Sequence, residues 1–155
     1  EIMQSCQNTF ISSTFWTERI GFVAALKTLE VMESINSWDI ISAQGNKIKE
    51  GWKKISNKYS INLDIFGLDA LPTFAFKHED NLKFKTLITQ EMLKKGFLAG
   101  NSCYVCIEHD DEIIDAYLSN LNEIFNLISK CIDNPQLIDE KLETEVCTSG
   151  FKRLN

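Results

Sequence analysis

The segment DDEIIDAYLSNLNEIFNLI, residues 110–128, carries the clearest amphipathic pattern in the chain. Its apolar residues recur at intervals of three and four, which places them on one face of a helix: Ile114, Tyr117, Leu118, Leu121, Ile124, Phe125 and Ile128. Asp110 can cap this helix, and Asp111 and Glu112 lie in its first turn, where the helix dipole favours acids. We therefore expect this helix to lie with its apolar face on a β-sheet.

Two strands are predicted upstream of that helix. Ile61, Leu63 and Ile65 alternate with polar residues, and the segment TFAFK, residues 73–77, follows a turn that ends at Pro72. A short connection favours an antiparallel pair. The β-rich segment 102–108 predicts a further strand.

The remaining helices are predicted at residues 17–34, 39–59, 84–95 and 137–143. Gly96 is a natural left-handed stop for the third of these. In the first helix, Thr17 is the predicted cap, and Phe22, Leu26 and Leu29 belong to an apolar stripe. Because glycine is costly inside a helix, Gly21 predicts a close approach by another backbone or a ligand. The pattern as a whole predicts an α+β fold with a small, mainly antiparallel sheet of three to four strands, covered by helices.

Composition narrows the class of protein. The chain has 155 residues, 44% of them hydrophobic and 25% charged, as in one ordinary globular domain. The net charge of -6 disfavours nucleic acids and anionic membranes as partners, and no apolar run approaches the roughly 20 residues of a membrane span. Five cysteines, an odd number, favour reduced thiols and a cytoplasmic location. The chain starts at Glu1, not at Met, from which we expect a fragment of a longer protein.

Three groups of residues invite a metal or acid–base interpretation. Cys103 and Cys106 form a C-x-x-C, but residues three apart in a strand face opposite ways, so two structural cysteines are favoured over zinc or redox chemistry. His78 lies beside acids in a polar loop, which favours a solvated turn over a metal or proton-transfer site. His109 is followed by the acids that begin the last long helix, for which capping is favoured. No metal site is predicted.

Hydroxyl residues lead into the first helix through the segment FISSTFWTERIGFVAAL, residues 10–26. Ser12, Ser13 and Thr14 crowd the approach to a helix N-terminus, whose free N–H groups can bind a phosphate or another anion. The same residues serve equally as ordinary helix caps. The residues alone leave both interpretations open.

This segment resembles the start of the C-terminal segment of class III aminotransferases, which depend on pyridoxal 5'-phosphate and include the glutamate-1-semialdehyde aminomutases. The later segment ITQEMLKKGFLAGNSCYVCIEHDDEIIDAYL, residues 88–118, resembles the closing part of the same family. Together the two resemblances cover residues 10 to about 125. They imply the C-terminal small domain of the fold-type I aminotransferases over residues 1–131, opening with the cofactor-phosphate loop and a long connecting helix, and a C-terminal tail over residues 132–155.

The resemblance also implies a function. Thr14, with Ser13, would bind the cofactor phosphate of the neighbouring subunit, while Trp16 and Asn101 would face the substrate. The Schiff-base lysine would lie in the large domain, so no catalytic residue is assigned here and this chain alone should not transaminate. The implied partners are that large domain, a second subunit of a homodimer, a small amino donor and an aldehyde or ketone acceptor. Semialdehyde aminomutases carry an acid where this chain has Asn101, which favours transamination of another carbonyl compound.

A free-standing α+β binding or regulatory module without a cofactor is the alternative prediction. The two differ in their surfaces: an enzyme fragment should expose an apolar face where the large domain docks, whereas a free module should have no large apolar patch.

Overall fold

The computed structural model describes residues 18–150, and the chain divides into two units, residues 1–37 and residues 38–155. The described part of the first unit contains the helix α2 (Arg19–Ser34), whose residues are all exposed. The predicted helix is confirmed, and the side chains of its predicted apolar stripe, Phe22, Leu26 and Leu29, are exposed. A side chain at Gly21 would meet nothing within 4 Å, so the expected close approach is absent from the described residues.

The predicted cap of α2 also differs from the structure. The helix begins at Arg19 and its N-cap residue is Glu18, which makes no side-chain capping bond. Thr17 lies outside the described residues.

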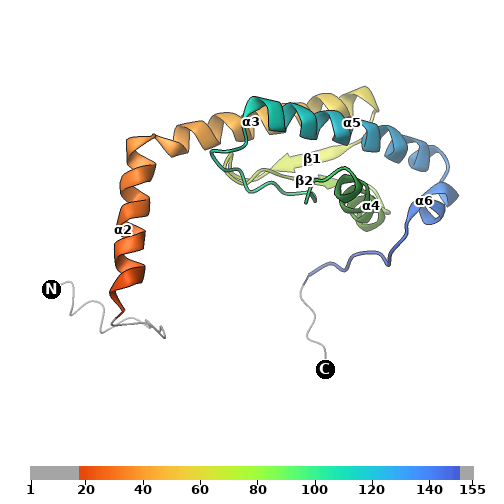
Figure 1. Cartoon of the computed structure of the whole chain (residues 1–155). Helices are drawn as coiled ribbons and strands as arrows, with labels where there is room; N and C mark the ends of the chain where they lie inside the picture. The colour runs from red at the N-terminus through yellow and green to blue at the C-terminus, as the bar shows by residue number, and fades with distance from the viewer. Residues whose placement is uncertain (1–17, 151–155) are drawn as a thin grey trace, which may run out of the picture. The chain divides into compact units, whose positions relative to one another are not determined.

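The second unit contains the remaining elements of Figure 1 in the order α3 (Ser37–Lys58), β1 (Leu63–Phe66), β2 (Thr73–Phe76), α4 (Asn81–Lys94), α5 (Asp111–Asp133) and α6 (Gln136–Lys141). The strands β1 and β2 pair antiparallel, with Leu63 opposite Phe76 and Ile65 opposite Phe74. The α+β class and the antiparallel pair are confirmed. No helix within residues 18–150 is long and apolar enough to cross a membrane.

The predicted strand at residues 102–108 is wrong, and the described sheet therefore has two strands. Residues 101–105 do run beside β2, where Thr73 and Ser102 form an isolated bridge. However, the N–H groups of Cys103 and Val105 donate to Pro72 and Ala70, which precede β2. The segment therefore overlaps the strand at only one residue pair, and no ladder develops.

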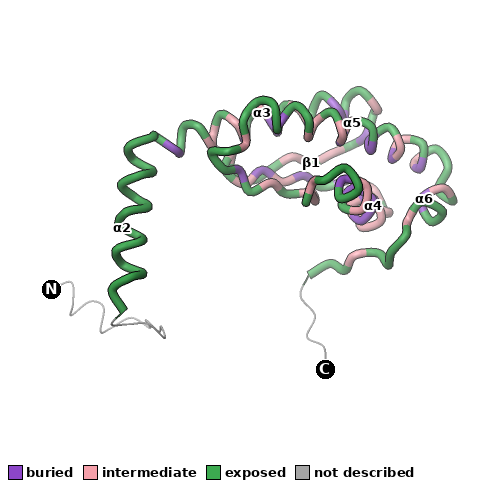
Figure 2. Tube along the Cα trace, viewed as in Figure 1, coloured by how far each residue is buried: buried purple, intermediate pink, exposed green. Residues whose placement is uncertain are grey.

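The long helices bury the faces that their periodicity predicts. On α3, Ile48, Trp52 and Ile55 are buried, and Figure 2 shows buried positions confined to one side of α5. The α5 cap is also as predicted, since the Asp110 carboxylate accepts the Ile113 N–H at 2.9 Å. Gly96 has a φ of 85°, which confirms the left-handed stop after α4.

Aromatic rings form the centre of the second unit. Phe74 packs edge-on against Trp52, Phe76 and Phe125, with ring centroids 4.8, 5.7 and 6.1 Å apart. Phe84 of α4 extends the cluster, 5.4 Å from Phe76. Edge-to-face pairs of this kind add stability beyond the area that they bury. The cluster joins α3, β2, α4 and α5.

Two side chains of α4, Gln90 and Thr86, bond the backbone of the C-terminal tail. The Gln90 amide donates to the Lys141 carbonyl at 2.9 Å and accepts the Glu143 N–H at 2.8 Å, in the manner of a backbone group. The Thr86 hydroxyl accepts the Cys147 N–H at 3.0 Å. Ile138 of α6 is 1% exposed, so this part of the tail belongs to the core. The division into residues 1–131 and 132–155 remains a prediction.

Two glycines inside α3 are explained by close packing. A Cβ atom at Gly45 would overlap the carbonyl oxygen of Asp69, and one at Gly51 would overlap the Leu118 side chain. The helix is nevertheless continuous. The glycines bring α3 close to the loop after β1 and to α5.

We expect Gly45→Ala to lower the free energy of unfolding by about 1–3 kcal/mol, because a backbone carbonyl leaves no room for the methyl group. The change should destabilise although alanine favours helices over glycine by about 1 kcal/mol. Urea unfolding followed by circular dichroism measures the effect. Glu50→Ala, at an exposed position of the same helix, is the control and should stay within about 0.5 kcal/mol of the wild type. Equal stability of Gly45→Ala and Glu50→Ala would contradict the packing.

Candidate functional site

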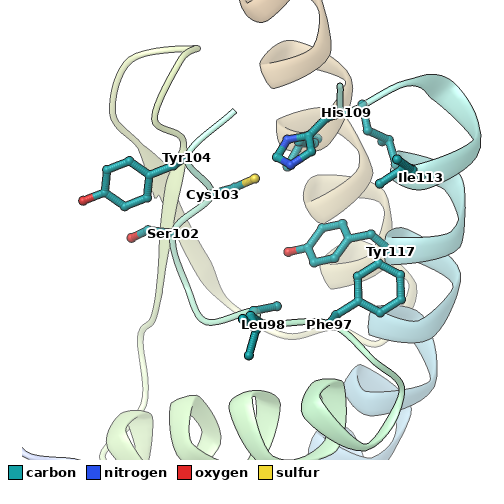
Figure 3. Close-up of a pocket in the computed structure, with 11 residues that line it drawn as sticks. Phe97, Leu98, Ser102, Cys103, Tyr104, His109, Ile113 and Tyr117 are labelled. Carbon is teal, nitrogen blue, oxygen red and sulfur yellow. The ribbon is translucent and has the colours of Figure 1, made fainter. Parts of the chain in front are cut away.

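A mainly apolar pocket of about 270 Å³ lies between residues 97–104, the start of α5 and one side chain of α3. Figure 3 shows the residues that line it, among which the polar groups are Ser102, Cys103, Tyr104, His109 and Tyr117. The apolar lining residues are Ile48, Phe97, Leu98, Ala99, Ile113 and Ile114. An apolar pocket with few polar groups is the usual form of a small-molecule site.

Tyr117 sits between the pocket and the aromatic core. Its hydroxyl oxygen accepts the indole N–H of Trp52 at 3.0 Å, and its ring lies 6.2 Å from that of Phe97. Burial raises the pKa of Tyr117 well above its ordinary value, and the bond from Trp52 only partly opposes that shift. Tyr117 therefore stays protonated at neutral pH and cannot serve there as a general base.

Cys103 is the thiol that faces the pocket. In Figure 3 its side chain points to the pocket, whereas Ser102 and Tyr104, on either side of it, point away. Burial raises the pKa of the Cys103 thiol, and the nearby Cys106 adds to the shift. Because the thiolate is the nucleophile, a raised pKa makes Cys103 less reactive at neutral pH than an ordinary cysteine.

His109 stabilises the turn that leads into α5. The ring Nδ1 of His109 accepts the backbone N–H of Cys106 at 3.4 Å, and the backbone N–H of His109 donates to the Cys106 carbonyl at 3.0 Å. Asp110 caps the helix, so the capping role predicted for this acidic cluster is confirmed. Among residues 18–150, no three His, Cys, Asp or Glu side chains converge as metal ligands.

The predicted site residues fall into two groups. Ser13, Thr14 and Trp16 lie outside the described residues. Asn101 is described, and its side-chain amide donates to the Phe74 carbonyl at 2.9 Å while its backbone carbonyl accepts the Phe74 N–H at 2.9 Å. Asn101 thus anchors residues 101–105 to β2, and its role toward a substrate remains a prediction.

Sequence reasoning missed the bond between Trp52 and Tyr117. Tyr117 belongs to the predicted apolar face of residues 110–128, and Trp52 falls within the predicted helix at residues 39–59, but periodicity carries no information about the pairing of their polar atoms. The available signal was the presence of a tryptophan and a tyrosine on long predicted helices, because buried indole and phenol groups usually find partners.

Comparisons with known proteins point to one class of enzyme. No family model matches the chain. It is 26% identical over 128 residues to the 3-aminobutyryl-CoA aminotransferase of Cloacimonas acidaminovorans, a match that covers 77% of this chain and 31% of the relative. It is 23% identical over 120 residues to the glutamate-1-semialdehyde 2,1-aminomutase of Persephonella marina, covering 68% of this chain and 28% of that protein. The chain thus spans less than a third of either curated relative.

A solved structure shares the fold. The FumI protein of Sphingopyxis sp. MTA144, solved as its PLP internal aldimine, matches with a TM-score of 0.72 and 17% sequence identity. The match covers 87% of this chain and 34% of the FumI chain. At this identity the match establishes the fold alone.

We expect Tyr117→Phe to lower the free energy of unfolding by about 1–3 kcal/mol, because the fully buried Trp52 N–H would lose its acceptor. Urea unfolding followed by Trp fluorescence measures the loss. Tyr104→Phe removes a hydroxyl from a residue that is 79% exposed and should change stability by less than about 0.5 kcal/mol. The two variants together separate the buried bond from a general effect of hydroxyl removal, and equal losses in both would contradict its importance.

Proposed function

We infer that this chain, a homologue of the pyridoxal-phosphate-dependent aminotransferases and aminomutases, is part of such an enzyme. The sequence resemblance predicted this relationship, and the two curated relatives confirm it. The structural neighbour, solved as its PLP internal aldimine, shares the fold. We further propose that the chain is the C-terminal small domain of a class III enzyme that transfers an amino group between a small amino donor and an aldehyde or ketone.

The observation that supports this proposal best is the exposed apolar face of α2, formed by Phe22, Leu26 and Leu29. The large apolar side chains of this face are exposed, with Leu26 at 69%, Phe22 at 61% and Leu29 at 61%. Contiguous exposed apolar surface usually marks a contact with another part of a protein. Docking of a large domain would explain this exposed apolar face, whereas a free-standing module should have no large apolar patch on its surface.

The residues that precede α2 suit the phosphate group of the cofactor. Ser13 and Thr14 supply hydroxyl donors just before a helix whose N-cap residue, Glu18, makes no side-chain capping bond. Free N–H groups and hydroxyls at a helix N-terminus are the donors that a phosphate requires. When bound, pyridoxal phosphate supplies an electron sink for carbanion chemistry. In the proposal, Thr14 and Ser13 bind and orient its phosphate.

Substrate contacts are proposed for Trp16 and Asn101. The Asn101 amide already donates to the sheet, but an amide has further hydrogen-bonding capacity, so contact with a polar substrate group is compatible with its observed bonds. Asn101 replaces the acid of the semialdehyde aminomutases, which supports transamination over the aminomutase reaction.

The proposed assembly is a homodimer in the cytoplasm. A phosphate-binding threonine that acts across the subunit interface requires a second subunit. The four cysteines at positions 103, 106, 131 and 147 are free thiols, which supports a reducing compartment.

The test is an absorbance spectrum of the full-length enzyme loaded with pyridoxal phosphate. We expect the visible band of an internal aldimine, and we expect Thr14→Ala to weaken cofactor retention by about tenfold through loss of one hydrogen bond to a charged group. Equilibrium dialysis against free cofactor measures that loss.

Thr89→Ala is the matched control, because the Thr89 hydroxyl bonds only its own helix at the Lys85 carbonyl among the described residues. It should retain the cofactor as the wild type does. The absence of any aldimine band would overturn the proposed function, and equal retention by Thr14→Ala and Thr89→Ala would remove Thr14 from the phosphate site.

A further inference from the structure

Along the outer edge of β1, some backbone groups have no hydrogen-bond partner within residues 18–150. The Lys77 N–H donates to the Asn62 carbonyl at 3.0 Å, which identifies that pair as a hydrogen-bonded one in the antiparallel ladder. Bonded pairs alternate, so Asp64 and Phe66 bond to β2 while the N–H and C=O groups of Leu63 and Ile65 point away from it. No described residue bonds these four groups.

The opposite edge of the sheet is covered. There the outward groups of Phe74 are paired with the backbone and side chain of Asn101. In Figure 1, β2 lies along one side of β1. Proteins usually cover or disrupt a free strand edge, because its row of donors and acceptors is a template for another strand. On β1 neither a proline nor a bulge does so.

A groove runs beside this free edge. It has a volume of about 760 Å³ and lies between β1 and α3. Ile61, Leu63 and Ile65 provide its aliphatic part. Its polar part includes Lys53 and Asn57 of α3, whose side chains have no partner among the described residues. The groove can therefore accept one further backbone segment with alternating side chains.

We propose that an extended segment from the part of the enzyme outside this chain pairs with β1 along this edge. The inference rests on the proposed function. The match to the structural neighbour covers only 34% of that neighbour's chain. Most of an enzyme of that fold is therefore available to supply the strand. Addition of a strand satisfies the four backbone groups at once.

The chemistry of the edge specifies the occupant. Residues opposite Leu63 and Ile65 face the groove and should be apolar, with an acid within reach of the Lys53 ammonium. The residue opposite Asp64 lies on the other face and should not be acidic. A second copy of β1 does not meet this requirement, because antiparallel pairing about a twofold axis through Asp64 would place two aspartates opposite each other.

Hydrogen–deuterium exchange of the full-length enzyme, resolved to single amides, tests the proposal. Asp64 and Phe66, which bond to β2, are the internal controls. If a strand is added, Leu63 and Ile65 should exchange within about tenfold of these controls. Exchange at Leu63 and Ile65 more than about 100-fold faster than at Asp64 and Phe66 would overturn the proposal.

A pair of variants tests the hydrogen bond itself. Ile65→Pro removes an outward N–H and leaves the bonds to β2, whereas Ile65→Val keeps the N–H and the branched side chain. In the full-length enzyme, only Ile65→Pro should lower the midpoint of urea unfolding markedly. Equal midpoints would mean that the Ile65 N–H bonds nothing, and the proposal would fail.

The aldimine spectrum keeps this proposal separate from the proposed function. An aldimine band together with fast exchange would overturn the added strand and leave the enzyme assignment standing. Slow exchange without an aldimine band would overturn the enzyme assignment while supporting an extended segment on β1.

Discussion

The packing of Phe74 is the constraint on which the second unit depends. Its side chain is 0% exposed and contacts the rings of Trp52, Phe76 and Phe125, which come from α3, β2 and α5. Its backbone N–H and carbonyl are both bonded to Asn101. One residue therefore joins the sheet to two helices on its side-chain face and to residues 101–105 along its edge.

The candidate pocket is a consequence of this arrangement. Residues 101–105 are held against β2, and the bond between Trp52 and Tyr117 sets the position of α5, so a gap remains between them. Two of its side chains, Tyr117 and Cys103, are unsuited to act as a base or a nucleophile at neutral pH, because burial raises the pKa of both. In the proposed function, the cofactor and the rest of the enzyme would supply the chemistry.

Two surfaces of the described residues are exposed, and they differ in the type of contact that they can make. The face of α2 is apolar, so burial against another apolar surface would stabilise it without regard to direction. The edge of β1 offers oriented donors and acceptors, which accept only an extended backbone in register. A domain that works within a larger enzyme would need both types of contact, one for affinity and one for orientation.

The sequence by itself determined the helices, their apolar faces, the antiparallel pair and the α5 cap, because these depend on local periodicity and on short-range bonds such as that between Asp110 and Ile113. Only the tertiary structure decided what covers each face. It reduced the predicted third strand to a single bridge at Ser102 and directed the Asn101 amide to the backbone of β2. Periodicity identifies an apolar face or a strand-forming segment, but the register and the neighbour come from packing between residues far apart in the chain.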